Sequence, residues 1–395
     1  MLKEYWTRVS LQVDYKKTGD MKLQMVDLHG QYQKIKSEVD AAIAAVIDNT
    51  VFINGPKVAE FADHLAHYCG AKHVIPCANG TDALQIALMA LNLKPGDEII
   101  VPAFTFVASA EVLGLLGLVP VMVDVDYDTF NVTVENLEKG LSTKTKAIVS
   151  VHLFGQSCDM EPIIEFARKH NLYVIEDNAQ TIGAKYTFTN GIQKNTGTIG
   201  HIGCTSFFPS KNLGCYGDGG AMMTNDPNLA AKLKIIANHG QTKKYYHSVI
   251  GCNSRLDTIQ AAILDVKLKH LDEYCRARYN AAQYYTDQLQ DIPGIETPVE
   301  SSFSTHVYHQ YTMKIGDGRR DELKEYLQSQ GVPSMIYYPL PLNEQDAFKP
   351  IARIAEPLHI AKALCDSALS IPIHTELTTD QQDIIISTLK QFFNK

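Results

Sequence analysis

The chain has 395 residues, of which 45% are hydrophobic and 20% are charged, and its net charge at pH 7 is −8. A chain of this length can bury a large core and should form more than one domain. The acidic balance excludes a global basic footprint for nucleic acid, and the lack of any run of eighteen apolar residues excludes a membrane-spanning helix and a membrane partner.

The first segment, residues 1–20, differs from the rest of the chain. It carries Lys, Arg and Glu together with the only tryptophan, Trp6, and it lacks the apolar core of a signal peptide. An upstream start and an ordered extension both fit this segment. We expect the large domain to begin after it, with a helix, and to span residues 21–260.

Short apolar runs alternate with helix-like stretches through this large domain. The expected helices are residues 30–48, 56–69, 82–91, 107–117, 159–170 and 228–238, followed by one long helix over about residues 254–291. The expected strands are residues 73–76, 98–102, 119–124, 146–151, 172–176, 203–208 and 220–224. Strands that alternate with helices predict an α/β fold, in which a mostly parallel seven-stranded sheet has helices on both faces.

The pattern changes toward the C-terminus. A turn-rich stretch over residues 186–197 predicts a surface hairpin. After the long helix, the chain restarts with strands at residues 308–315 and 333–338 around a helix at residues 320–329. We therefore expect residues 261–395 to form a linking helix and a small α+β domain.

Lys211 is a candidate for chemistry because of where it lies. It ends Ser-Phe-Phe-Pro-Ser-Lys and precedes a glycine-rich run, residues 214–221, on a short loop between two strand-like segments. An amine in such a place can form a Schiff base with a carbonyl, and that reaction needs the neutral amine. Alone, this lysine is weak support, because most lysines lie on the surface.

Asp177 follows a short apolar run and belongs to an acidic pair with Glu176. The carboxyl end of a buried parallel strand is where an open α/β sheet presents catalytic groups. A pyridoxal phosphate (PLP) enzyme needs a carboxylate against the pyridine nitrogen, so that the ring stays protonated and can accept electrons. The alternative, about equally favoured, is that Asp177 caps the next helix.

Gly80 and Thr81 lie between a strand-like run and an apolar helix pattern that includes Leu84 and Leu91. The first turn of a helix has free N–H groups and a positive dipole end, which together bind phosphate. The alternative is that Thr81 or Asp82 is only an N-cap. In the segment 102–109, an aromatic ring at a strand end suits stacking on a flat cofactor, although a core aromatic is the commoner case.

Together and in this order, these segments resemble the DegT-type nucleotide-sugar aminotransferases, PLP enzymes with the fold of aspartate aminotransferase, which is PLP fold type I. The resemblance runs from about Met25 to Phe393. Its marks are residues 26–28, 52–56, 79–84, 102–110, 152–156, 176–180, 206–211, 217–220, 238–240, 253–257 and 338–339.

The resemblance implies that Lys211 binds PLP covalently, that Asp177 pairs with the pyridine nitrogen and that Gln180 reaches the ring hydroxyl. Lys211 and Asp177 are thus the expected catalytic residues. The other implied cofactor contacts are a ring stack from Phe106 and phosphate contacts from Gly80, Thr81, Ser206 and, across a homodimer interface, Asn253 of the partner subunit.

Residues 243–247, Lys-Lys-Tyr-Tyr-His, offer cationic and aromatic groups that suit a nucleotide diphosphate, although a solvated loop is an equal alternative. Related enzymes place a Tyr/His segment here against the substrate. The expected substrate residues are Lys243, Tyr246, His247 and Tyr337. The chain departs from relatives at Tyr337 (often His), at Phe154 (often Tyr) and at Thr181-Ile182 (a pair that includes His in some relatives). The resemblance implies that these positions lie nearer the sugar than the cofactor.

The resemblance implies a transaminase that moves an amino group from L-glutamate to a keto group of a nucleotide-linked keto-deoxy sugar. The stretch from Tyr245 to Leu264 is more similar to enzymes that act on 3-keto sugars than to those that act on 4-keto sugars, so amination at C3 is expected. The resemblance also implies that the amino sugar enters a surface polysaccharide such as lipopolysaccharide or a related glycoconjugate. Two alternatives are a PLP-dependent sugar dehydratase, whose relatives carry His in place of Lys211, and a non-catalytic regulator, against which Lys211, Asp177 and Gln180 argue.

The remaining reactive side chains give no further site. Eight cysteines are scattered without a C-x-x-C pair, which suits reduced thiols and a cytoplasmic protein. His64 and His67 lie on one expected helix, with His73 close by, but neither a carboxylate nor a cysteine completes a site. We therefore expect surface histidines and no metal.

Overall fold

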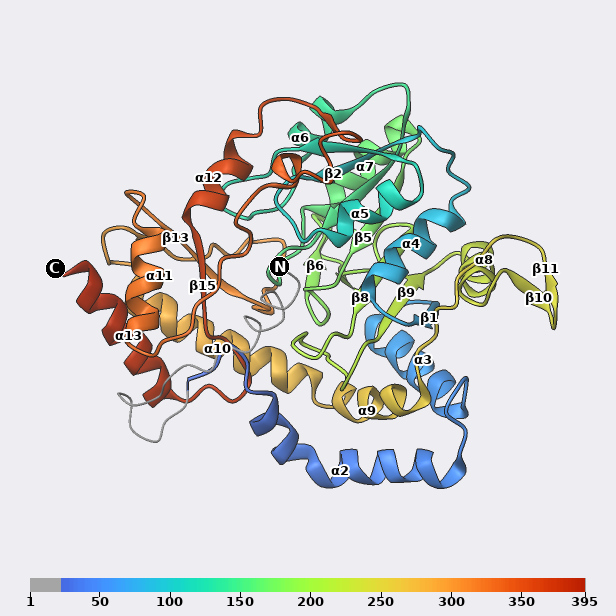
Figure 1. The fold of residues 1–395 in the computed structure, drawn as a ribbon, viewed down its shortest axis with the longest axis horizontal. Helices are drawn as coiled ribbons and strands as arrows, with labels where there is room; N and C mark the ends of the chain where they lie inside the picture. Colours follow the sequence, from blue (N-terminus) through green and yellow to red (C-terminus); the bar gives the residue numbers. More distant parts are fainter. Residues whose placement is uncertain (1–22, 395) are drawn as a thin grey trace, which may run out of the picture.

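The computed structural model describes residues 23–394, so the expected extension, residues 1–20, lies outside them. An eight-stranded sheet forms the centre, in the order β1-β9-β8-β5-β4-β2-β3-β14 (Figure 1). Its strands are β1 (His73–Cys77), β2 (Glu98–Pro102), β3 (Val119–Val123), β4 (Thr145–Val151), β5 (Tyr173–Asp177), β8 (Ile202–Ser206), β9 (Gly220–Thr224) and β14 (Arg353–Ile354). Strand β9 is antiparallel to both neighbours, and the other pairings are parallel.

All seven predicted strands lie in this sheet. Strands β4 and β5 are buried almost throughout, as expected of parallel strands covered on both faces. The eighth strand, β14, was not predicted, because two residues are too few to show an alternation.

Helices cover both faces of the sheet. They are α2 (Leu28–Asn49), α3 (Pro56–Cys69), α4 (Gly80–Ala90), α5 (Ala108–Leu115), α6 (Val134–Gly140), α7 (Met160–His170), α8 (Pro227–Ala237) and α9 (Thr258–Leu268). Met222 of β9 packs into the core that holds α4 and α8, whereas its neighbours Ala221 and Met223 pack against α3 and α9. Successive side chains of a strand point to opposite faces, so these two cores lie on opposite sides of the sheet.

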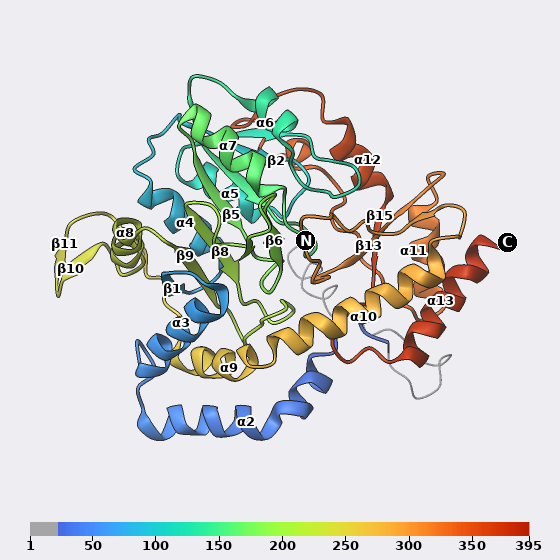
Figure 2. The same ribbon diagram turned by 180° about the vertical axis from the view of Figure 1, so that it is seen from behind.

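The predicted single helix over residues 254–291 is wrong in its continuity. The structure has α9 and then α10 (Leu271–Leu289), which leads to the C-terminal domain (Figure 2). At the junction, the amides of Lys269 and His270 bond to carbonyls three residues back, which interrupts the regular ladder. Asn253 and Asp257 form isolated β-bridges instead of helix, so the helix also begins later than expected.

The C-terminal domain holds the antiparallel strands β12 (Ile295–Glu296), β13 (Tyr311–Ile315) and β15 (Ala368–Ile371). Its helices are α11 (Arg320–Ser329), α12 (His359–Ser367) and α13 (Thr379–Phe393), with a 3-10 turn at Leu342–Glu344. The predicted strand at residues 333–338 is wrong, because only Met335 forms a bridge, to Ser370. Pro333 opens this segment and Pro339 follows it, and prolines restrict strand pairing because they lack an N–H donor.

Part of the predicted second domain packs on the large sheet. Strand β14 pairs with β3, and Asp124, just after β3, accepts hydrogen bonds from the amides of Ile360 and Ala361 at the start of α12. The predicted division into residues 21–260 and 261–395 stays a prediction.

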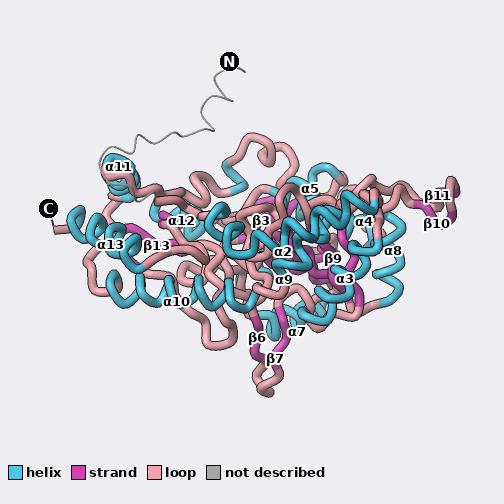
Figure 3. Tube along the Cα trace, turned by 90° about the horizontal axis from the view of Figure 1, so that it is seen from below, coloured by secondary structure: helices cyan, strands magenta, loops and turns pink. Residues whose placement is uncertain are grey.

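Two hairpins project from the body (Figure 3). Strands β6 (Lys185–Thr187) and β7 (Gln193–Asn195) form the hairpin that the turn-rich sequence predicted. Strands β10 (Gln241–Lys243) and β11 (Tyr246–His247) form the other, beyond α8. Between residues 23 and 394, the structure contains no helix that is long and apolar enough to cross a membrane.

Candidate active site

A cavity of about 780 Å³ lies where the carboxyl ends of β5 and β8 meet the start of α4. Of the predicted site residues, it is lined by Gly80, Thr81, Phe106, Asp177, Gln180, Ser206, Lys211 and Tyr337. Residues from five separate parts of the sequence thus meet at one edge of the sheet, which is where an open α/β sheet binds its ligands.

The start of α4 forms a narrow cup. The N-cap is Asn79, whose side-chain oxygen accepts from the amide of Asp82 at 2.8 Å, so the alternative that Thr81 or Asp82 is the cap is wrong. A Cβ on Gly80 would lie 2.7 Å from the Cβ of Ser206, so only glycine allows the helix start to approach the end of β8 this closely. The start of α4, with its free N-terminal amides, and Ser206 therefore line the same part of the cavity wall.

Asp177 ends β5 and is only 6% exposed. Its Oδ2 accepts from the Ser109 hydroxyl at 2.7 Å, and its Oδ1 accepts from the amide of Ala179 at 3.2 Å. The alternative that Asp177 caps a helix is wrong, because residues 179–183 form turns. The carboxylate is thus held by one donor on each oxygen while it borders the cavity.

The neighbouring carboxylate, Glu176, points away from the cavity. It is fully buried and accepts from His152 Nε2 at 2.9 Å and from the amides of Gly197 and Gly200 at 2.7 and 2.6 Å. Burial alone would raise the pKa of Glu176, but these hydrogen bonds outweigh it and lower the pKa. Of the acidic pair, only Asp177 is therefore available to a ligand in the cavity.

Lys211 lies in the turn after β8, where its amide donates to the Phe208 carbonyl at 2.8 Å. Burial lowers the pKa of Lys211 to about 8, although the charge of Asp177 acts to raise it. The neutral amine that Schiff-base chemistry needs is therefore available close to neutral pH. The following glycine-rich loop is held by Lys267, whose Nζ donates to the Gly214 carbonyl at 2.5 Å.

His309 lies against Lys211, with its Nε2 3.5 Å from the lysine Nζ. Burial, first, and the nearby charges of Lys211 and Arg278 lower the pKa of His309 well below its usual range, so this imidazole is neutral. Arg278 on α10 holds the segment through hydrogen bonds to the carbonyls of Tyr308 and His309. His309 was not predicted from the sequence, because it comes from a different domain and no motif marks it.

Aromatic rings and the side-chain amide of Gln180 form another part of the cavity wall. Gln180 accepts from the amide of Phe154 at 2.8 Å and donates to the Tyr338 hydroxyl at 3.3 Å, which fixes its orientation. Phe106 is 52% exposed and its ring centroid lies 6.2 Å from that of Tyr338. The alternative that Phe106 is a core aromatic is wrong, since its ring is presented to the cavity.

The remaining predicted residues do not line this chain's cavity. Asn253 is exposed and bridges Asn238, and Lys243, Tyr246 and His247 lie on the projecting β10–β11 hairpin. The Lys243 ammonium lies 5.3 Å from the centroid of the Tyr246 ring. Their predicted roles stay predictions.

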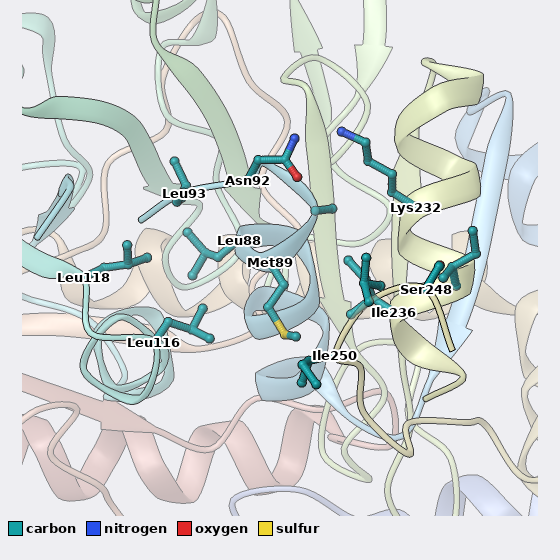
Figure 4. A pocket seen from close by; sticks show the side chains of 13 residues that line it. Leu88, Met89, Asn92, Leu93, Leu116, Leu118, Lys232, Ile236, Ser248 and Ile250 are labelled. Carbon is teal, nitrogen blue, oxygen red and sulfur yellow. The ribbon is translucent and has the colours of Figure 1, made fainter. Parts of the chain in front are cut away.

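A second cleft, of about 430 Å³, lies between α4, α8 and the chain after β11 (Figure 4). Asn92 and Lys232 lie on one side of it, and the rest of its wall is mostly aliphatic, with Met89 and Ile250 on the other side. Lys232 is the only charged residue in its lining, so the groups suited to acid–base chemistry converge in the larger cavity instead. Among residues 23–394, no three His, Cys, Asp or Glu side chains are grouped so that they could hold a metal ion.

Known proteins are similar to this chain over almost its whole length. The model of the DegT/DnrJ/EryC1/StrS aminotransferase family matches residues 33–390. The pleiotropic regulatory protein of Geobacillus stearothermophilus is 44% identical over 375 residues, which are 94% of this chain and 99% of the relative. The UDP-2-acetamido-2-deoxy-3-oxo-D-glucuronate aminotransferase of Pseudomonas aeruginosa is 43% identical over 367 residues, 93% of this chain and 99% of the relative.

A solved structure supports the same assignment of fold. NtdA from Bacillus subtilis, with bound cofactor PMP (pyridoxamine phosphate), superposes with a TM-score of 0.86 at 28% identity and covers 99% of this chain and 92% of its own. The predicted fold, an α/β sheet of PLP fold type I with a smaller C-terminal domain, is confirmed.

Proposed function

The chain belongs to the DegT/DnrJ/EryC1/StrS aminotransferase family, and from this premise we propose that it moves an amino group from L-glutamate to the C3 keto group of a nucleotide-linked sugar, with PLP as its cofactor. The observation that carries the proposal is the meeting of Lys211, Asp177 and the start of α4 in one cavity. A reactive amine, a buried carboxylate and an anion cup are the three groups that PLP requires.

The residues present fit this cofactor. The cup of Gly80, Thr81 and Ser206 suits the phosphate, because glycine at position 80 leaves the helix amides open to it. Asp177 would hold the ring nitrogen, Gln180 the ring hydroxyl and Phe106 the ring face. When bound, PLP stores the electrons that are released as a proton leaves the substrate carbon.

Lys211 is the residue we assign to proton transfer. Because burial brings its pKa to about 8, its Nζ can take the proton from the substrate carbon that carries the amino group, and later return it. His309 is neutral and faces the same nitrogen, so it adds no competing positive charge. Amino donor and keto acceptor would use the same cavity in turn, which gives ping-pong kinetics.

The sugar is assigned by relationship. The Pseudomonas aeruginosa relative is named for a UDP-linked 3-oxo sugar, which supports a 3-keto substrate here. Tyr337 lines the cavity and is the residue of this chain that we expect to contact the sugar. We propose that the product enters a surface polysaccharide, lipopolysaccharide or a related glycoconjugate.

We propose that the active unit is a homodimer with shared sites. Asn253 does not line this chain's cavity and is exposed, so its expected phosphate contact can be made only across a subunit interface. The β10–β11 hairpin, with Lys243, Tyr246 and His247, begins shortly after Asn238, which forms a β-bridge with Asn253. The hairpin projects from the body (Figure 1), which suits a contact with the partner's nucleotide sugar. All eight cysteines are free, which fits our assignment to the reducing cytoplasm.

A regulatory role is the second candidate, because the relative from Geobacillus stearothermophilus carries that name. The arrangement of Lys211, Asp177 and Gln180 around one cavity favours the enzyme. A sugar dehydratase is disfavoured because such relatives replace this lysine with histidine.

The test is spectroscopic. Purified protein is loaded with PLP, treated with L-glutamate, and then given a panel of UDP- and dTDP-linked 3-keto and 4-keto sugars. Glutamate should convert the bound PLP spectrum to that of PMP with one equivalent of 2-oxoglutarate, and a 3-keto sugar should restore it. Bound PLP that does not respond to glutamate would contradict the enzyme, and restoration by 4-keto sugars alone would contradict amination at C3.

A further inference from the structure

We propose that Ser109 is a positioning residue that holds the Asp177 carboxylate in place against the cofactor ring nitrogen, and that Thr105 is the next member of the same hydrogen-bond chain. The inference rests on the proposed PLP function, and it assigns a role to the hydroxyl group that contacts Asp177 and to the hydroxyl group next to it.

The direction of the hydrogen bonds follows from chemistry. Ser109 Oγ lies 2.7 Å from Asp177 Oδ2, and Thr105 Oγ1 lies 3.3 Å from Ser109 Oγ. An ionised carboxylate can only accept, so Ser109 must donate its single hydroxyl proton to Asp177. Thr105 must then donate to the Ser109 oxygen, which gives an ordered chain from Thr105 through Ser109 to Asp177.

The position of Ser109 argues against a purely structural role. It is the second residue of α5 and is 0% exposed. Serine hydroxyls commonly bond to backbone groups that are close to them in the sequence. Here the hydroxyl instead reaches a carboxylate on another strand, 68 positions away in the chain.

The two donors on Asp177 fix the carboxylate plane. The amide of Ala179 holds Oδ1 and Ser109 holds Oδ2, so the group cannot rotate without losing both hydrogen bonds. The carboxylate still borders the cavity, while Ser109 lies behind it and Thr105 reaches the wall.

With the cofactor bound, a carboxylate held in this position would keep its negative charge opposite the ring nitrogen and would favour the protonated ring. Without the Ser109 donor, the carboxylate would lose one of its two restraints and could turn away from the ring nitrogen. The ring would then be protonated less and would be a weaker electron acceptor.

The experiment compares Ser109→Ala with Ser150→Ala in the PLP-loaded enzyme. Ser150 is a matched control, because it is also 0% exposed, but its hydroxyl bonds to the Ile175 carbonyl on β5. The probe is PLP labelled with ¹⁵N in the ring, whose NMR shift reports whether that nitrogen is protonated. The second readout is kcat and KM for L-glutamate at full PLP occupancy.

Ser109→Ala should move the ¹⁵N signal toward that of neutral pyridine and lower kcat by about 10- to 100-fold, with KM changed by less than about threefold. Ser150→Ala should change neither. An unchanged ¹⁵N signal in Ser109→Ala, with a protonated ring in the unaltered enzyme, overturns this inference alone. Failure of the unaltered protein to bind PLP overturns the proposed function instead.

If Ser109→Ala does not fold, Ser109→Cys gives the same test, because a thiol of similar size is a weak donor. The signal should then move in the same direction by a smaller amount. A signal identical to that of the unaltered enzyme contradicts the role of Ser109.

Discussion

Replacing Asp177 by asparagine tests the electrostatic part of the site. The two side chains have nearly equal volume, so packing at this buried position should be retained. Asparagine has one acceptor oxygen where aspartate has two. If that oxygen keeps the amide of Ala179, the new NH₂ group turns to the Ser109 hydroxyl, which can accept from it.

The fold therefore tolerates the change, but the charge opposite the ring nitrogen is lost. Loss of a buried charge partner in the transition state costs about 3–4 kcal/mol, or about 100- to 1000-fold in rate. The assay is the single-turnover reaction of PLP-loaded enzyme with saturating L-glutamate, with PLP occupancy measured separately for each protein. Cofactor should still bind through Lys211 and the cup at Gly80.

Asp124→Asn is the matched control. Asp124 is also buried at the carboxyl end of a sheet strand, and it also accepts hydrogen bonds from backbone amides, those of Val125, Ile360 and Ala361 at 3.1, 2.9 and 2.6 Å. This variant should lower Tm without changing the rate per bound cofactor. A rate loss below about threefold in Asp177→Asn would refute the assignment of Asp177 to the ring nitrogen.

Three further outcomes are expected. Gly80→Ala should weaken PLP binding by at least about tenfold in a PLP titration, because the new Cβ would lie 2.7 Å from that of Ser206. Gly316→Ala is the control and should bind PLP normally, because its new Cβ would have no atom nearer than 3.6 Å. Equal PLP affinity in both variants would show that the cup is not the phosphate site. The rate at which the apoenzyme binds PLP covalently should rise with pH through a midpoint near 8. Burial lowers the pKa of Lys211 from 10.5 to about 8, and the neutral amine is the reactive form. A midpoint near 10.5 would contradict the lowered pKa of Lys211. Co-expressed Lys211→Ala and Asn253→Asp chains should regain activity that neither has alone, because one of the two sites in a hybrid dimer then contains both native residues. Verified heterodimers without recovered activity would show that Asn253 does not contribute to the partner's site.

The part of the fold that the sequence predicts is the part that depends on local burial. Strands β4 and β5 are apolar over nearly their whole length because both of their faces are covered, so they stand out in the sequence. Asp177 is the last residue of strand β5, Lys211 lies in the loop after strand β8, and Gly80 is the first residue of helix α4. These residues could be placed together because parallel strands end at one edge of a sheet.

The features that escaped prediction depend on contacts between distant segments. Ser109 looks like an ordinary residue of a helix start, and only the structure shows its hydroxyl against Asp177. His309 comes from the other domain and reaches Lys211 across 98 positions of sequence. Strand β14 likewise forms only by pairing with β3, which is far from it in sequence, and periodicity does not record this. The strand expected at residues 333–338 is limited instead by the prolines at positions 333 and 339.

Lys211 is the residue that we propose carries the cofactor, and borohydride reduction tests this role directly. Reduction of the PLP-loaded protein, followed by peptide mass spectrometry, should find a pyridoxyl group fixed on Lys211 and on no other residue. Lys267 is the internal control, because burial also lowers its pKa to about 8 while its Nζ is engaged by the Gly214 carbonyl. A label on Lys267, or a Lys211→Ala protein that transaminates L-glutamate at a near-normal rate, would contradict this role for Lys211.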